Sequence, residues 1–185
     1  MLYLNDRLSD LDLDLALKEL SPHRREQTLR LRGELQRRAS AAVYLLLAQA
    51  LREEYGLTEM PEWGYGEHGK PFLIGFPHIS FNLSHCSEAA ICVVSDVEVG
   101  VDVERVRPLR EGVVNYSMSA AEIEEIYAAE RPDLAFTRLW TMKEAVAKWA
   151  GQPVLHNIKN LLQGMRHRID TVVSENGRYV YSVCK

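Results

Sequence analysis

The chain has 185 residues, of which 46% are hydrophobic and 26% are charged, and its formal net charge at pH 7 is −4. This length allows one ordinary domain or two small halves, and the apolar fraction is sufficient for a buried core. An acidic chain does not fit a protein whose whole surface holds nucleic acid, because that function requires a strongly basic domain. Any site for an anion is therefore expected to be local.

Signals for export, membrane insertion and disulfide formation are not seen. The N-terminus lacks a basic stretch followed by an apolar run, which a secretory signal would need. The longest apolar stretch, residues 39–48, is shorter than the roughly 20 residues of a membrane-spanning helix. Cys86, Cys92 and Cys184 form an odd set without a CxxC spacing, which disfavours a disulfide framework or a zinc site. We therefore expect a cytoplasmic protein that binds no membrane and no nucleic acid.

The chain first predicts a helical region. Ser21-Pro22 suits a helix start, because serine caps the first turn and proline fits the first helical position. Apolar residues then recur at helical spacing over about residues 22–55, with a break expected at Gly33 and an end at Gly56.

A region of turns and strands follows. Residues 61–75 are rich in glycine and proline and are expected to be largely turns. Residues 78–83 alternate in polarity, residues 89–94 are mostly apolar, and residues 97–103 alternate again. The connections are short, so we expect three antiparallel strands.

The second half of the chain repeats this order. An S-x-x-E capping box beginning at Ser119 opens a helix that reaches about residue 129. Residues 134–150 predict a long helix, and residues 171–183 predict a hairpin that turns at Asn176-Gly177. Helix followed by sheet thus occurs twice, which indicates an α+β protein.

The strand around residue 102 carries two acidic side chains on one face. Asp102 and Glu104 are two residues apart, so their stems lie roughly 7 Å from each other in a strand. Both could converge on one hard cation such as Mg²⁺. Taken alone, the same pattern more often marks the solvated face of a half-buried strand.

The long helix near the C-terminus carries a second pattern. Trp140, Glu144 and Lys148 stand at i, i+4 and i+8 on one helix face. Glu144 could be a third metal ligand and Lys148 a phosphate contact. The alternative is an ordinary helical Glu–Lys pair beside a buried tryptophan.

Further candidates for anion binding are basic, hydroxyl or imidazole side chains. They comprise Lys70 in a Gly-Lys-Pro turn, Ser84 and His85 at a strand end, and the arginines Arg24, Arg25, Arg30, Arg32, Arg37 and Arg38. An arginine can bind a phosphate through two parallel hydrogen bonds. The alternatives are a solvated lysine, a structural histidine and a solvated helix face.

Four motifs, in this order and spacing, resemble the 4'-phosphopantetheinyl transferases of the Sfp type. They are GKP at 69–71, FNLSH at 81–85, GVDVE at 100–104 and WTMKEAVAKWAG at 140–151. The resemblance implies an α+β fold of two similar helix-plus-antiparallel-sheet halves, related by a pseudo-twofold, with the ligand site between them. The halves would be residues 1–103 and 104–185. The segment that includes Gln152-Pro153-Val154 and the terminal hairpin matches the family weakly.

The resemblance also implies roles for individual residues. Asp102, Glu104 and Glu144 would hold Mg²⁺, and Glu144 and Lys148 would be catalytic, with Lys148 on the pyrophosphate of coenzyme A. Coenzyme A would also contact the following residues: Arg24, Arg38, Lys70, Pro71, Ser84 and His85.

The implied enzyme is a phosphopantetheinyl transferase of the holo-[acyl-carrier-protein] synthase type, acting as a monomer. It would move the phosphopantetheine arm of coenzyme A to a serine of an apo acyl or peptidyl carrier protein and release adenosine 3',5'-bisphosphate. Carriers of fatty acid, polyketide and nonribosomal peptide synthesis all qualify. The basic, partly apolar segment 105–110 is expected to steer an acidic carrier.

Two other functions fit parts of the sequence. A magnesium-dependent phosphohydrolase could use the same carboxylates on a nucleotide or coenzyme A without any carrier. A noncatalytic binding module could hold RNA or an acidic protein with its N-terminal arginines. Coenzyme A hydrolysis without a carrier would favour the first function, and binding that survives replacement of Asp102 would favour the second.

Overall fold

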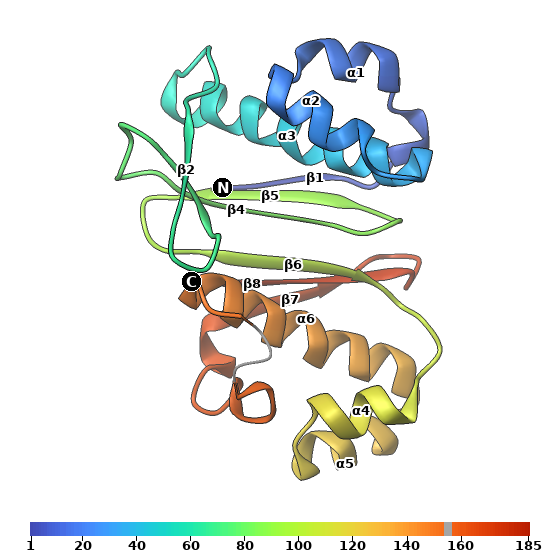
Figure 1. Ribbon diagram of the computed structural model, residues 1–185. Helices are drawn as coiled ribbons and strands as arrows, with labels where there is room; N and C mark the ends of the chain where they lie inside the picture. The colour runs from blue at the N-terminus through green and yellow to red at the C-terminus, as the bar shows by residue number, and fades with distance from the viewer. Residues whose placement is uncertain (154–156) are drawn as a thin grey trace.

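The computed structural model describes residues 1–153 and 157–185 and has its strands between two groups of helices (Figure 1). Helices α1 to α3 cover one side of the strands, and α4 to α6 lie on the other side. The expected α+β class, with antiparallel sheets, is confirmed. Val154, in the weakly matched segment, lies outside the described residues.

The first half contains a three-stranded antiparallel sheet in the order β1-β5-β4 and a separate hairpin of β2 and β3. Its elements are β1 (Leu2–Asn5), α1 (Leu13–Glu19), α2 (Pro22–Leu29), α3 (Glu34–Tyr55), β2 (Trp63–Tyr65), β3 (Pro71–Leu73), β4 (Ser80–His85) and β5 (Ala90–Ser95). A short 3-10 turn, Leu8–Asp10, links β1 to α1.

The expected helix boundaries in this half are confirmed. The Ser21 side chain accepts a hydrogen bond from the backbone N–H of Arg24 and caps α2, with proline in the first turn. Gly33 is the N-cap of α3. Gly56 ends α3 with a φ of 69°, a left-handed conformation that glycine adopts without strain.

The hairpin of β2 and β3 lies in the segment that was expected to be largely turns. Its two strands pair antiparallel, with Gly64 opposite Phe72. A Cβ on Gly64 would lie 2.2 Å from Cζ of Phe72, so the aromatic ring crosses the glycine backbone directly. Strands this short carry too few side chains for alternation to reveal them, which also explains why β1 was not expected.

The second half contains a three-stranded antiparallel sheet in the order β6-β8-β7. Its elements are β6 (Gly100–Arg105), α4 (Glu111–Ser117), α5 (Ala120–Ala128), α6 (Pro132–Ala150), β7 (Ile169–Val173) and β8 (Tyr179–Cys184), with 3-10 turns at Ile158–Asn160 and Arg166–Arg168. The capping box at Ser119 opens α5 as expected.

The third expected strand belongs to this second sheet. All of β6, from Gly100 to Arg105, pairs with β8 rather than with β4 or β5. The expectation that short connections would place it antiparallel beside the preceding strands was therefore wrong, because a terminal hairpin far along the chain competes for its hydrogen bonds. The expected division between residues 103 and 104 falls inside β6.

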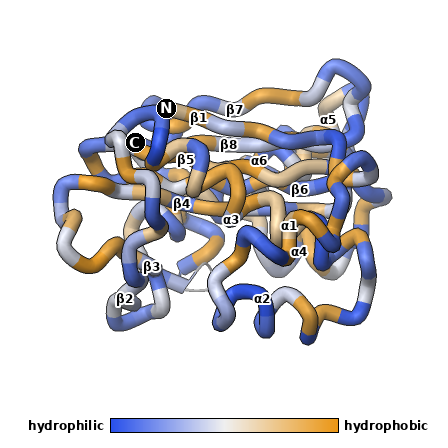
Figure 2. The backbone as a smooth tube through the Cα atoms, turned by 90° about the horizontal axis from the view of Figure 1, so that it is seen from above, coloured by the Kyte–Doolittle hydropathy of each residue, from blue (hydrophilic) through white to orange (hydrophobic). Residues whose placement is uncertain are grey.

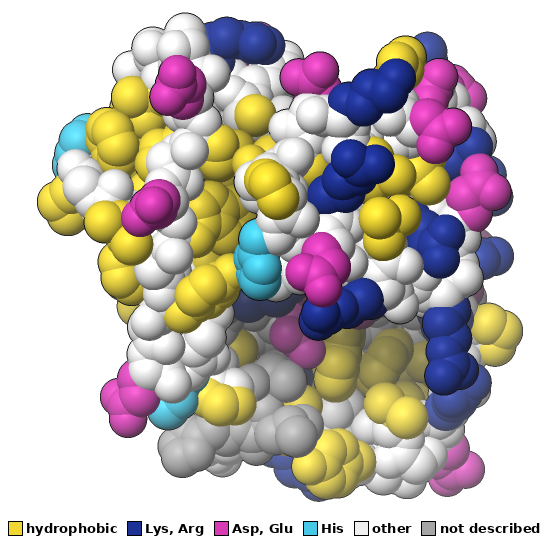
Figure 3. All heavy atoms as spheres, turned by 45° about the horizontal axis from the view of Figure 1, so that its top comes forward, with side chains coloured by type: hydrophobic (Ala, Val, Ile, Leu, Met, Phe, Trp, Pro, Cys, Tyr) yellow, Lys and Arg dark blue, Asp and Glu magenta, His cyan; other side chains and the backbone are white. Residues whose placement is uncertain are grey.

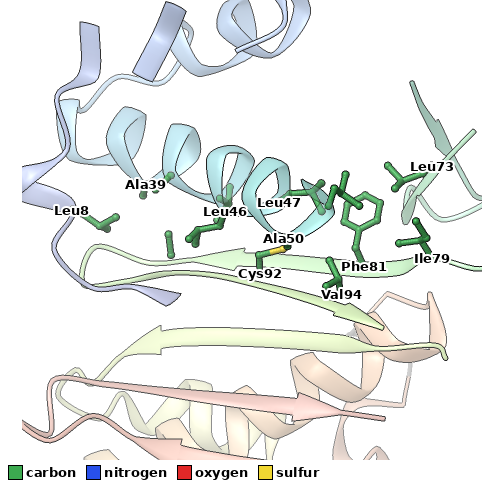
Figure 4. Close-up of a cluster of buried hydrophobic side chains, with 14 residues drawn as sticks. Leu8, Ala39, Leu46, Leu47, Ala50, Leu73, Ile79, Phe81, Cys92 and Val94 are labelled. Carbon is green, nitrogen blue, oxygen red and sulfur yellow. The ribbon is translucent and has the colours of Figure 1, made fainter. Parts of the chain in front are cut away.

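Strand β5 contributes to two hydrophobic cores. Cys92 and Val94 face α3 in the first core, with Leu47 and Phe81 (Figure 4). The alternate residues Ile91 and Val93 pack in a second core, formed with Val99 just before β6 and with residues of β6 and β8: Val101, Val103, Tyr179 and Val183. Burial on both faces explains why β5 is hydrophobic along its length whereas α2, on the outside, is largely hydrophilic (Figure 2). The two halves therefore share a core.

In the part of the chain that the structure describes, no helix combines the length and hydropathy needed to cross a bilayer.

Candidate active site

The two halves meet where β4 lies beside β6. The backbone N–H of Val101 donates to Oδ1 of Asn82 at 2.9 Å, and the backbone N–H of Val103 donates to Oγ of Ser84 at 3.2 Å. These contacts advance in the same direction along both strands, so β4 and β6 run parallel and are joined by side chains. Because side chains of β4 make these bonds in place of its backbone, Ser84 reaches Asp102 of β6 directly.

Asp102 is the buried centre of this junction. Its side chain is buried, with the residue 4% exposed. Its Oδ1 accepts hydrogen bonds from Oγ of Ser84 at 2.9 Å and from Nζ of Lys148 at 2.7 Å. Its Oδ2 is buried and has no hydrogen-bond partner among the described residues. A buried carboxylate oxygen without a partner is costly, which makes this atom a natural ligand for a cation.

Glu104 and Glu144 share the electrostatic environment of Asp102. Burial raises the pKa of Glu104 to about 7, and the negative charges of Asp102 and Glu144 add to the shift. Burial and the charge of Asp102 also raise the pKa of Glu144. We call Asp102, Glu104 and Glu144 the acidic cluster, and a cation bound among them would relieve the repulsion that raises the pKa of Glu104 and Glu144.

The donor set fits magnesium in its chemistry. Three carboxylates, one with an unpartnered buried oxygen, supply the hard oxygen ligands that Mg²⁺ prefers. Within residues 1–153 and 157–185, no three acidic, histidine or cysteine side chains are gathered into a formed coordination shell. Lys148, at 2.7 Å from Asp102, instead balances part of the charge.

Lys148 reaches the junction from α6. It lies one helical turn after Glu144, so both side chains leave the same face of the helix. Its Nζ also donates to Oγ of Ser84 at 3.1 Å, which connects α6 with both β4 and β6. The close approach of α6 depends on Gly100, because a Cβ there would lie 2.1 Å from the carbonyl oxygen of Ala145.

His85 ends β4 beside this cluster. It is accessible to solvent, but nearby atoms still displace enough water to lower its pKa. The positive charges of Arg24 and Lys148 lower that pKa further. The imidazole is therefore neutral at pH 7 and lies close to two cations, a suitable setting for a phosphate group.

Arg24 belongs to the same region although it lies on α2. Its Nη2 donates to the carbonyl oxygen and to Oγ of Ser40, both at 3.3 Å, and its Nε is buried without a partner in the described part of the chain. Burial lowers its pKa. It lines an aromatic pocket of about 420 Å³, whose lining residues are Ser21, His23, Arg24, Gln27, Tyr44, Met60, Pro61, Glu62, Trp63 and Tyr65. A partly satisfied guanidinium beside aromatic rings can accept an anionic, ring-containing ligand.

The structure places Arg38 elsewhere. Its Nη2 bonds to Glu34 at 2.7 Å and its Nη1 to the carbonyl oxygen of Ser9. It lines a different cavity, together with the acidic side chains of Asp10, Asp12 and others. Arg24 and Arg38 are therefore not brought into one pocket.

Lys70 lies at the seam between the halves. Its Nζ contacts Glu98 at 2.5 Å, the carbonyl oxygen of Val99 at 3.3 Å and that of Trp149 at 3.1 Å. Lys70 and Pro71 line a cavity of about 370 Å³ beside Gly151. In this arrangement the ammonium group ties the end of α6 to the first half.

A groove opens beside Glu104, and we call it the apolar groove. It has a volume of about 680 Å³ and is lined by Glu104, Arg105, Arg107, Pro108, Leu109, Arg110, Val113, Phe136, Thr137 and Trp140. Figure 3 shows a hollow between the two halves in which acidic, basic and apolar side chains meet. The groove offers a larger group access to the acidic cluster.

Two residues of the junction were not anticipated as site residues. Asn82 holds the β6 backbone, and Glu98 pairs with Lys70. Asn82 stands two positions before Ser84 in a strand, so the alternation of residues 80–85 placed both on one face. Glu98 has no comparable sequence signal, because its partner is 28 residues away.

Comparison with known proteins adds the family context. Residues 98–178 match the profile of the 4'-phosphopantetheinyl transferase superfamily. The chain is 28% identical over 154 residues to a 4'-phosphopantetheinyl transferase of Bacillus subtilis, covering 81% of this chain and 68% of the relative. It is 42% identical over 123 residues to 4'-phosphopantetheinyl transferase AcpT of Salmonella typhi, covering 62% and 60%. Identity to 4'-phosphopantetheinyl transferase Sfp of Bacillus subtilis strain 168 is 24% over 154 residues, covering 82% and 69%.

Proposed function

Because the chain belongs to the 4'-phosphopantetheinyl transferase superfamily, we propose that it moves the phosphopantetheine arm of coenzyme A to a serine of an apo acyl or peptidyl carrier protein. The reaction is Mg²⁺-dependent and releases adenosine 3',5'-bisphosphate. The observation that carries the proposal is Asp102, which is buried between the halves with Lys148 on one oxygen and, among the residues that the structure describes, no partner on the other.

The side chains of the junction suit an in-line displacement on the pyrophosphate. Asp102, Glu104 and Glu144 would hold Mg²⁺, which when bound neutralises charge on the pyrophosphate. Lys148 stabilises the negative charge of the departing bisphosphate. Glu144, whose pKa is raised, accepts the proton of the serine hydroxyl.

The transfer exchanges one phosphorus–oxygen bond for another. The serine oxygen forms a bond to the phosphorus that carries pantetheine, and the bond from that phosphorus to the bridging oxygen breaks. The bridging oxygen leaves with the bisphosphate and the bonding electrons. Glu144→Gln tests its assignment as the base, because retention of most of the turnover at saturating Mg²⁺ would reduce Glu144 to a ligand at most.

The nucleotide end of coenzyme A would occupy the aromatic pocket. Arg24, with its buried unpartnered Nε, would bind the 3'-phosphate, and His85 and Ser84 would contact the phosphates. Arg24 is preferred to Arg38, which lines a different cavity. All these groups come from one chain, so the enzyme would act as a monomer.

The carrier serine would approach through the apolar groove. This groove begins at Glu104 and combines apolar walls with Arg105, Arg107 and Arg110. An acidic carrier would be attracted by these arginines while its serine-bearing segment contacts the apolar walls. Fatty acid, polyketide and peptide carriers all present a serine that could enter.

The decisive experiment measures the intact mass of an apo carrier protein after incubation with the enzyme, coenzyme A and Mg²⁺. The wild-type chain should add one phosphopantetheine arm. Asp102→Ala and EDTA should each reduce transfer about 100-fold or more, because both remove the charge stabilisation at the pyrophosphate. Asp96→Ala, which removes an exposed aspartate six residues away in the same chain, serves as the matched control.

A different outcome would redirect the assignment. If no carrier gained mass while coenzyme A was consumed, the chain would be a phosphohydrolase. If coenzyme A remained intact and bound equally well to Asp102→Ala, the chain would be a binding module.

A further inference from the structure

A cavity of about 330 Å³ adjoins the apolar groove and shares Arg105 and Arg107 with it. Its other charged lining residues are Arg131, Asp133 and Arg178. We call this cavity the basic cleft. It brings together the segment after β6, the start of α6 and the hairpin of β7 and β8, which are far apart in the sequence.

Positive charge is in excess in the basic cleft. Arg131 pairs with Asp133 at 3.0 Å, whereas Glu88 pairs with both Arg105 at 3.5 Å and Arg178 at 3.2 Å. Two carboxylates therefore face four arginines, Arg107 included, which leaves a net charge of 4 − 2 = +2 in a chain whose total is −4.

The arginines are held in place but remain accessible. The side chains of Arg105, Arg131 and Arg178 are 49%, 50% and 63% exposed. Arg131 is the N-cap residue of α6, and its Nη1 lies 3.0 Å from where a Cβ on Gly177 would stand. Guanidinium groups anchored on a helix start and a hairpin lose little freedom when a partner binds them.

The basic cleft adjoins the acidic cluster through shared lining residues. Arg107 lines both the basic cleft and the apolar groove, and Glu104 lines that same groove. Arg107 has no salt-bridge partner in the described ranges, 1–153 and 157–185. A partner bound in the cleft would therefore lie next to the entrance at Glu104.

We propose that the basic cleft is a docking surface for an acidic surface of the apo carrier protein, whose serine enters the neighbouring apolar groove. This inference rests on the proposed transferase function. A stable protein interface buries about 800 Å² on each partner, so a carrier domain at the groove must also cover adjacent surface. The basic cleft adjoins the apolar groove and carries the positive charge that complements an acidic partner.

The test is steady-state transfer to an acidic apo acyl carrier protein at low and moderate salt. Arg131→Gln with Arg178→Gln should raise the KM for the carrier about tenfold at low salt and reduce its salt dependence. The KM for coenzyme A and kcat should change by no more than about twofold. Arg131→Lys with Arg178→Lys keeps the charges and should restore most of the carrier affinity.

Arg52→Gln is the matched control, because Arg52 is exposed near the end of α3 and lines none of the cavities described here. Thermal unfolding checks that each variant folds, and the single variants replace the double variant if it does not.

Three results would overturn the proposal. One is an unchanged carrier KM in the glutamine variant of an active enzyme. Another is a change confined to the KM for coenzyme A, which would assign the cleft to the nucleotide. The third is tight binding of duplex DNA that disappears in the glutamine variant, which would make the cleft a nucleic-acid site. Absence of transfer by the wild-type enzyme would instead reject the proposed function, and the docking proposal with it.

Discussion

Glu104 is a carboxylate of the site whose charge changes close to neutral pH. Its pKa is about 7, against a usual value of 4.5, because burial and the charge of Asp102 disfavour the ionised form. A group whose pKa is raised on folding contributes stability that is fully present below the unfolded value and is lost as pH rises through the folded value. Glu104 should therefore stabilise the protein near pH 4.5 and progressively less up to pH 8.

Glu104→Gln should remove this pH dependence. In EDTA, the wild type should lose on the order of 2 kcal/mol relative to the variant between about pH 5 and pH 8. Thermal unfolding of both proteins across this range measures the difference. Parallel curves would show that Glu104 ionises normally in the folded protein.

Residues of the candidate site differed in how far the sequence could predict them. Asp102 with Glu104, and Glu144 with Lys148, are each a local pattern on one strand or one helix, and the structure joins the two patterns through the contact of Lys148 with Asp102. Asn82 and Glu98 act through partners 19 and 28 residues away, which no local spacing encodes.

At the scale of elements, the packing of α6 on β6 depends on one missing methyl group. A Cβ on Gly100 would lie 2.1 Å from the carbonyl oxygen of Ala145 and 2.3 Å from the backbone nitrogen of Trp149. Backbone atoms of a long helix cannot move aside individually, so the whole helix would have to shift. Glu144 and Lys148 would move with it.

Gly100→Ala should therefore reduce both stability and activity. We expect a loss of about 1–3 kcal/mol in the free energy of unfolding, typical of overpacking. The shift of Lys148 from Asp102 should also lower kcat. Urea unfolding and the transfer assay measure these effects. Gly112→Ala is the control, because a Cβ there would meet no atom within 4 Å beyond its chain neighbours and the backbone of its own helix, α4, where alanine is favoured. Equal behaviour of the two variants would contradict the argument.

Elements with their own stop signals were predicted well, and short elements were not. Helix α3 lies between Gly33 and Gly56, α6 ends at Gly151, and α5 opens with a capping box, so local chemistry defines them. Strand β6 was recognised as a strand but given the wrong neighbours, because its partner β8 lies at the other end of the half. Pairing over such a distance is decided by the shared core.

At the scale of the whole molecule, that shared core couples the two halves. Side chains of β5 in the first half and of β6 and β8 in the second pack together, including Ile91, Val101 and Val183, each at most 5% exposed. Side chains of β4 also satisfy backbone N–H groups of β6. Separating the halves would expose apolar surface and leave these N–H groups unsatisfied.

The chain should consequently unfold as one cooperative unit. Its three tryptophans divide between the halves, because Trp63 packs in the first and Trp140 and Trp149 pack in the second. Trp63→Phe leaves reporters only in the second half, and Trp140→Phe with Trp149→Phe leaves a reporter only in the first.

Urea unfolding followed by fluorescence should give, in each variant, the same midpoint as its far-UV circular dichroism, the test of two-state behaviour. The comparison is made within each variant, so that a change in stability caused by the substitution cancels. If the fluorescence of either half changed at a lower urea concentration than the circular dichroism, that half would open first. The active site, whose groups come from both halves, would then exist only while the shared core remained intact.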